Sequence, residues 1–139
     1  MEDHLVELAA EFLAQSRLEG GPTSAPPDKL VPETELDGYA VQVVVHQILQ
    51  KAGYGRLAGH KVGCTTEVMQ KFLNVDYPCA GEVFNSTVYE KTTILPLSKF
   101  HRVGIECEIA ARIGSDMIGT LGPYTIESVK DAVGAMMAA

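Results

Sequence analysis

The segment from residue 20 to residue 33 is the feature that most limits how this chain can fold. It reads GGPTSAPPDKLVPE and holds four of the seven prolines in the chain. Proline fixes its own backbone φ, restricts the residue before it and has no N–H to donate, so the segment suits neither the interior of a helix nor a central strand. We therefore expect an extended connector that separates an N-terminal element from everything after residue 33.

A helix is predicted on each side of this connector. In residues 3–18 the apolar side chains recur at helical spacing, and the glycine pair at 20–21 ends the pattern. After the connector, Thr34 is predicted to cap a second helix, with Asp37 in the reciprocal position that Glu or Gln usually holds. Its wide apolar stripe predicts burial on more than one side, and Gly53 is expected to end it.

The remainder is predicted to be rich in β-strands. Strands are expected at 57–64, 82–89, 92–97 and 102–114, a short helix at 67–73 capped by Thr65 or Thr66, and a closing helix at 123–139 capped by Thr125. Helices followed by a β-rich segment make an α+β fold. We expect one domain over residues 1–139, divided into a helix and connector at 1–33 and a mixed region at 34–139.

The amino-acid composition limits the classes of molecule that this chain is expected to bind. A chain of 139 residues with 46% hydrophobic and 21% charged residues suits a single globular domain. Its net charge of −7 disfavours nucleic acid and anionic membranes as partners, and no apolar run approaches the roughly 18 residues of a membrane span. The first residues carry acids where a secretory signal would carry Lys or Arg. With three cysteines, too few for a disulfide framework, the composition predicts a cytoplasmic protein with reduced thiols.

Two carboxylates stand two residues apart in GIECEIAARIG, residues 104–114. On a strand, Glu106 and Glu108 would project to the same side, roughly 6–7 Å apart at the backbone. A solvated outer face is the usual interpretation of such a pair. The apolar neighbours instead favour an interior strand, where carboxylates would protonate or bind a cation. Oxygen ligands without a Cys/His cluster favour Mg²⁺ or Mn²⁺ over zinc.

Lys61 is the second candidate residue. It lies among glycines and apolar residues in GHKVG, residues 59–63, within a predicted strand. A lysine whose amine extends to solvent is the more common outcome. The functional alternative is a partly desolvated amine whose lowered pKa suits proton transfer. Cys79 lies in a predicted turn, and no Cys–His spacing marks it as a nucleophile, so an incidental thiol is the favoured interpretation.

The order of these segments resembles the 2-keto-4-pentenoate hydratase group of the fumarylacetoacetate hydrolase superfamily. The matching stretches are LDGYAVQ, GHKVGCTTEVMQKFLNV, PCAGEVFNSTVY, VGIECEIAARIG and YTIESVKDAVGAMMAA, which together span residues 34–139. The resemblance implies the mixed β fold of that superfamily and a Mg²⁺ or Mn²⁺ ion that polarises a 2-oxo acid. By position, it assigns Glu106 and Glu108 as metal ligands and Lys61 as the proton-transfer residue.

Two departures from the family pattern accompany this resemblance. Cys79 stands where the family loop typically carries an acidic residue, and the third metal carboxylate of the family lies on a strand beyond Ala139. The resemblance therefore covers only the N-terminal half or so of a typical member, and we expect a truncated form.

The leading hypothesis is metal-dependent hydration of a 2-oxo (2-hydroxydienoic) acid in catabolism, by a homo-oligomer. A 2-oxo acid decarboxylase of the same group is the nearest alternative. A non-catalytic remnant that serves as an assembly module is the alternative from a different class.

Overall fold

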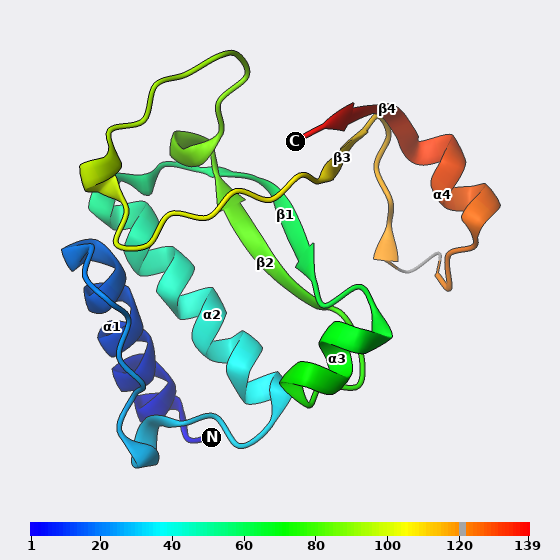
Figure 1. Cartoon of the computed structure of the whole chain (residues 1–139). Coiled ribbons are helices and arrows are strands. Elements are labelled where there is room, and N and C mark those ends of the chain that lie inside the picture. The colour runs from blue at the N-terminus through cyan, green and yellow to red at the C-terminus, as the bar shows by residue number, and fades with distance from the viewer. Residues whose placement is uncertain (120–121) are drawn as a thin grey trace. The chain divides into compact units, whose positions relative to one another are not determined.

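The computed structural model describes residues 1–119 and 122–139, which form helices and two small antiparallel sheets and confirm an α+β chain (Figure 1). The chain divides into two compact units, Met1–His101 and Arg102–Ala139. Within the described residues, no helix is long and apolar enough to cross a membrane.

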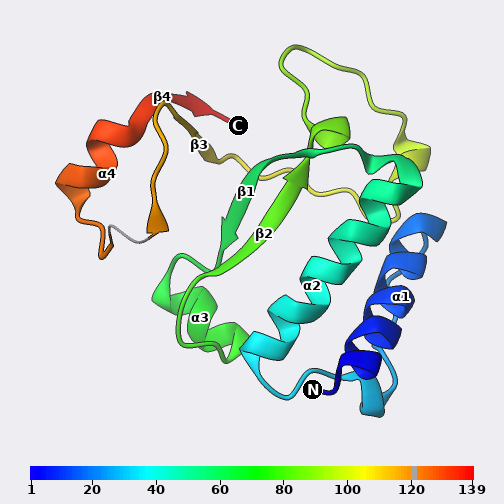
Figure 2. The same ribbon diagram turned by 180° about the vertical axis from the view of Figure 1, so that it is seen from behind.

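Two helices pack side by side in the first unit (Figures 1 and 2). Helix α1 spans Asp3–Glu19 and ends at Gly20, whose φ of 69° is the left-handed conformation that glycine adopts freely. Helix α2 spans Glu35–Leu49. As the sequence predicts, Thr34 caps α2, because its side-chain oxygen accepts a hydrogen bond from the backbone N–H of Asp37 at 3.2 Å.

The core of the first unit forms along the contact between α1 and α2. It buries small side chains from α1, one valine from α2 and one leucine from the connector: Val6, Ala9, Ala10, Val41 and Leu30. Leu30 belongs to a single 3₁₀ turn, Asp28–Leu30, so the proline-rich connector contributes to the core although it contains no α-helix or strand.

Beyond α2, one turn of π-helix, Gln50–Tyr54, continues the helical path. Gly53 lies inside this turn with a φ of 99° and ends the helical conformation, as the sequence predicts.

The first sheet is a two-stranded antiparallel pair. Strand β1 spans Leu57–Gly63 and strand β2 spans Cys79–Phe84, with helix α3, Glu67–Leu73, between them. Thr66 is the residue that caps α3. The predicted strand at 82–89 therefore begins earlier, at Cys79, and stops at Phe84, where the 3₁₀ turn Asn85–Thr87 follows.

The predicted strand at 92–97 is wrong. Residues 92–96 take no regular structure, and the 3₁₀ turn Leu97–Lys99 follows directly. A strand requires a neighbour for its backbone groups, and this segment pairs with neither of the two sheets found in the described residues. Pro96 also lacks the N–H that a paired strand would use.

The second unit contains strand β3, Ile109–Ile113, helix α4, Ile126–Ala132, and strand β4, Val133–Ala138. The strands pair antiparallel. Thr125 caps α4 in a reciprocal capping box with Ser128, which confirms the predicted cap.

The closing helix is predicted correctly only as far as Ala132, because residues 133–138 form a strand. A Cβ added to Gly114 would lie 3.0 Å from the Cα of Gly134, and one added to Gly134 would lie 3.1 Å from the Cα of Gly114, so glycine at both positions favours this close approach of the two backbones. The backbone N–H of Gly114 donates to the carbonyl of Ala132 at 2.7 Å, which joins the end of α4 to the segment after β3.

The predicted strand at 102–114 is likewise shorter than expected. Its regular part begins at Ile109, and the preceding Glu108 exchanges two backbone hydrogen bonds with Ala139, at 2.8 and 2.9 Å. Ile105 is 91% exposed and Ile109 is 77% exposed. The expectation of an interior strand is therefore wrong, because β3 pairs with one strand only and among the described residues of this unit only Ala132 is buried.

Candidate functional site

Lys61 lies in β1 directly across from Gly81 of β2. Lys61 is exposed, and a Cβ added to Gly81 would have no other atom within 4 Å, so no neighbouring atom fills the space over Gly81 itself. Lys61 helps to line a cavity of about 440 Å³ together with Arg17, Cys79 and Glu82. The structure thus places Lys61 at the edge of a concave surface and not in a dry interior.

Glu106 and Glu108 lie in the second unit, just before β3, and both are exposed. The prediction that both stand on a strand is wrong, because β3 begins only at Ile109. Their carboxylate oxygens suit a hard divalent ion in kind, and two such ligands fill only part of the octahedral shell that Mg²⁺ requires. Across residues 1–119 and 122–139, no group of three or more His, Cys, Asp or Glu side chains is placed to hold a metal ion.

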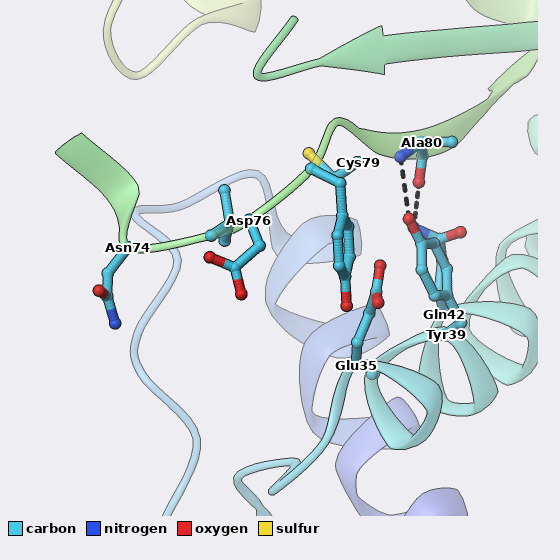
Figure 3. A pocket seen from close by; sticks show the side chains of 10 residues that line it. Glu35, Tyr39, Gln42, Asn74, Asp76, Cys79 and Ala80 are labelled. Carbon is cyan, nitrogen blue, oxygen red and sulfur yellow. Dashed lines mark hydrogen bonds between the residues drawn. The ribbon is translucent and has the colours of Figure 1, made fainter. Parts of the chain in front are cut away.

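A second cavity, of about 460 Å³, lies beside the first turns of α2 (Figure 3). Three segments of the first unit form it: the start of α2, residues 74–77, and the first two residues of β2. Its polar and ionisable lining residues are Glu35, Tyr39, Gln42, Asn74, Asp76, Tyr77 and Cys79.

Two side chains of α2 fix the wall of this cavity to β2. The hydroxyl of Tyr39 accepts a hydrogen bond from the backbone N–H of Ala80 at 3.1 Å, and Nε2 of Gln42 donates to the carbonyl of Ala80 at 3.1 Å (Figure 3). Both backbone groups of Ala80 are thereby paired on the edge of β2 that β1 does not cover. The cavity wall is therefore held in place by α2.

Glu35 and Tyr77 interact across the same cavity. A hydrogen bond to the Glu35 carboxylate raises the pKa of Tyr77, and the negative charge of Glu35 acts in the same direction. The hydroxyl therefore stays protonated over a wider pH range and remains a donor toward the carboxylate. With Asp76 also in the lining, this cavity presents acidic oxygens and a phenolic hydroxyl to a ligand.

Apart from Cys79, the polar and ionisable residues of this cavity were not predicted from the sequence. A signal was present, because Glu35, Tyr39 and Gln42 follow one another at spacings of four and three and so share one face of a helix. Tyr39 instead fitted the apolar stripe of α2. The contribution of Ala80 lies in its backbone, which no side-chain pattern reveals.

The sulfurs of Cys64 and Cys79 lie 3.7 Å apart. Cys79 is the first residue of β2 and not part of a turn, so the predicted turn is wrong at this position. Cys107 lies in the second unit, and all three cysteines are free thiols.

Comparison with known proteins gives a consistent set of relatives, although no family model matches the chain. The chain is 32% identical over 111 residues to a 2-keto-4-pentenoate hydratase of Paraburkholderia xenovorans, which covers 80% of this chain and 41% of the relative. The same figures hold for 2-keto-4-pentenoate hydratase 3 of Pseudomonas putida. A TodF product hydratase of Pseudomonas putida is 34% identical over 115 residues, covering 82% of this chain and 42% of the relative.

The chain thus spans about two-fifths of the length of the curated relatives that it matches. The relatives agree with the group to which the ordered motifs at residues 34–139 point. This chain is a partial match to the 2-keto-4-pentenoate hydratase group and corresponds to the N-terminal part of its members.

Proposed function

We propose that this chain provides the N-terminal part of a hydratase that adds water to a small 2-oxo (2-hydroxydienoic) acid. The observation that carries the proposal is the similarity, at 32–34% identity over 111–117 residues, to several proteins named as hydratases of this kind. We place the chain in the mixed β fold of the fumarylacetoacetate hydrolase superfamily on the same ground. We also infer a homo-oligomer, supported by the exposed apolar side chains of the second unit, and keep the cytoplasmic location as a prediction from the composition.

Lys61 is the residue to which we assign proton transfer. Lys61 lies on β1 opposite Gly81 and helps to line a cavity of about 440 Å³ that admits a small acid. In its charged form the amine can donate to a developing enolate oxygen or carbon, and in its neutral form it can take a proton from the substrate. The nearby Arg17 guanidinium lines the same cavity and can pair with a substrate carboxylate.

Glu106 and Glu108 are the residues to which we assign Mg²⁺ or Mn²⁺. When bound, such an ion supplies Lewis-acid polarisation of a carbonyl oxygen. The two glutamates themselves contribute negative oxygen ligands on a short segment whose backbone is fixed, next to β3, by the two hydrogen bonds between Glu108 and Ala139.

The test is loss of 2-hydroxypenta-2,4-dienoate absorbance in the presence of Mg²⁺, with the 139-residue chain. We expect Lys61→Ala to lower kcat by about 10²–10⁴-fold, the usual contribution of a general acid–base group. Lys91→Ala, which removes another exposed lysine of the first unit, is the matched control and should retain activity. Full activity of Lys61→Ala would remove the role of Lys61, and inactivity of the unmodified chain would show that it does not catalyse hydration by itself.

A binding measurement separates the metal assignment from catalysis. Titration calorimetry with Mn²⁺ should give a binding isotherm for the unmodified chain, weakened by at least tenfold in Glu106→Gln and in Glu108→Gln. The matched control is Glu90→Gln, a glutamate of the first unit that is also exposed. Equal Mn²⁺ affinity in all four proteins would contradict the assignment.

A further inference from the structure

Cys64 and Cys79 lie at the two ends of the segment that connects β1 to β2. Strand β1 ends at Gly63, residues 65–78 carry α3, and the chain returns to β2 at Cys79. Gly63 and Cys79 are partners in the strand register, so Cys64 follows directly after the residue paired with Cys79. The two sulfurs lie 3.7 Å apart, in contact, and neither takes part in the proposed hydration.

The backbone at Cys64 is held in an unusual conformation. Its φ of 55° lies in the left-handed region, which residues other than glycine adopt at a cost of order 1 kcal/mol or more. Nε2 of Gln70, from α3, donates a hydrogen bond to the carbonyl of Cys64 at 2.8 Å. Thr66, two residues further along the chain, caps α3. The turn between β1 and α3 is therefore fixed at Cys64 and at Thr66. The contact between the sulfurs is thus supported by the surrounding structure and does not depend on a flexible loop.

The two thiols differ in accessibility. Cys79 is exposed and also lines both cavities described above, whereas Cys64 is half-buried. Hydrogen bonding with Cys79, followed by burial, raises the pKa of the Cys64 thiol. Cys79 is therefore the thiol that meets a reagent from solution, and Cys64 is the thiol that resolves the product.

We propose that Cys64 and Cys79 are a modification site, a dithiol that forms a reversible intramolecular disulfide by exchange with a small-molecule disulfide of the glutathione class. The Cys79 thiolate attacks one sulfur of the oxidised reagent, forms a mixed disulfide and releases one reduced thiolate. The Cys64 thiolate then attacks Sγ of Cys79 and releases the second. Two cysteine thiols are oxidised, one reagent disulfide is reduced to two thiols, and the two cysteine protons pass to the released thiolates.

The geometry requires only a small movement for this reaction. The sulfurs must close from 3.7 Å to the bond length of about 2.05 Å, which side-chain rotation can provide between residues that adjoin one register pair. The product removes a thiol from the wall of each cavity and closes the segment 65–78 into a covalent loop. Because the product is covalent, the site can be tested without any hydratase activity.

The experiment uses the full 139-residue chain, oxidised glutathione and digestion with endoproteinase Lys-C without reduction. Cleavage after lysine places Cys64 in peptide 62–71, Cys79 in peptide 72–91 and Cys107 in peptide 100–130. We expect a linked species of peptides 62–71 and 72–91, and a fall from three free thiols to one. Dithiothreitol should restore all three.

Three serine variants complete the test. Cys107→Ser should still form the linked species and fall from two thiols to none, whereas Cys64→Ser and Cys79→Ser should not form it. The proposal is overturned by a linkage that includes peptide 100–130, by a disulfide between two copies of the chain, or by stable glutathione adducts on Cys79 without ring closure. Mapping of the unmodified chain keeps the result decisive if a serine variant folds poorly.

Discussion

The two units of this chain contain similar elements but bury very different amounts of apolar side chain. Each contains one antiparallel pair of strands and a helix with a threonine cap. The first unit also buries large side chains, with Leu49 0% exposed and Phe84 1% exposed. In the described part of the second unit, the buried residue is Ala132, and its isoleucines remain largely exposed.

This difference shows which forces hold each unit. In the first, burial of apolar surface supplies the main stabilisation, at roughly 25 cal/mol per Å². In the second, order depends on backbone pairing, the capping box of Thr125 and the close approach of Gly114 to Gly134. Each such hydrogen bond contributes only about 0.5–1.5 kcal/mol net. Opening of the second unit should therefore require less free energy than opening of the first.

Truncation of one side chain in each sheet gives the largest expected contrast. Phe84 packs edge-on against the rings of His46 and Tyr54, with centroids 5.5 Å apart in each pair. Phe84→Ala should lower the free energy of unfolding by about 3–5 kcal/mol, because it leaves a cavity among these rings. Ile109→Ala removes a side chain that is 77% exposed and should cost less than about 1 kcal/mol. Urea unfolding followed by circular dichroism measures both.

Phe84→Leu is the control for this pair, since it keeps most of the apolar volume and should cost less than Phe84→Ala. Equal losses for Phe84→Ala and Ile109→Ala would show that the second unit has a core of its own and would break the comparison.

Sequence reasoning succeeded where local chemistry decides the structure. The caps at Thr34 and Thr125, the end of α1 at Gly20 and the left-handed Gly53 all follow from the preferences of single residues. The strands at 57–64 and near residue 82 also agree with the sheet of the first unit, with shifted ends.

The wrong predictions concern segments whose structure depends on pairing with a distant part of the chain. Residues 133–138 have helical neighbours and suitable composition, yet they pair with β3 because Gly114 and Gly134 allow the backbones to meet. Residues 92–97 contain β-branched and apolar side chains but have no strand beside them among the described residues. Sequence patterns report the preference of a segment, whereas pairing depends on residues far along the chain.

The candidate site, like the fold, was predictable from the sequence only in part. Lys61 stood out because a lysine between glycines in an apolar strand is unusual, and the structure places it at a cavity. The contact of Cys64 with Cys79 was not predictable, because it depends on the register of β1 with β2 and on the left-handed φ of Cys64. The metal role of Glu106 and Glu108 remains a prediction.

Removal of a helix cap in each unit tests the difference in stability between the units with a smaller expected effect than Phe84→Ala. Thr34→Ala and Thr125→Ala should each cost about 1 kcal/mol of local helix stability. For Thr34→Ala the loss should lower the free energy of global unfolding, because α2 contributes to the core of the first unit. For Thr125 it should appear mainly as faster amide hydrogen exchange at Ser128 and Val129, whose N–H groups bond to Thr125.

Serine at either position keeps the accepting oxygen and should restore most of the stability. A Thr125→Ala variant that lowers the global midpoint as much as Thr34→Ala would contradict a loosely held second unit.

The smallest expected effect is the dependence of each unit on pH. In the first unit, a hydrogen bond from the Met1 amine, supported by Thr34, lowers the pKa of Asp37 and raises that of the amine. A lowered carboxyl pKa stabilises the fold above its ordinary value of about 3.9, and this stability is lost as pH falls through the folded pKa. A raised amine pKa stabilises below about 8 and is lost as pH rises through the folded value.

The first unit should therefore lose stability from this pair at both ends of the pH range. In the second unit, the backbone N–H of Glu127 and then the Thr125 side chain lower the pKa of Glu127, so its loss should occur only on acidification. Hydrogen exchange in α2 and in α4, measured from about pH 3 to about pH 10 and corrected for intrinsic rates, resolves the two. Asp37→Asn should remove the acidic limb in α2, weaken the alkaline limb, to which Glu33 and Asp3 also contribute by their charge, and leave α4 unchanged. If the alkaline limb in α2 kept its full size in Asp37→Asn, a group other than the Met1–Asp37 pair would have to be its source.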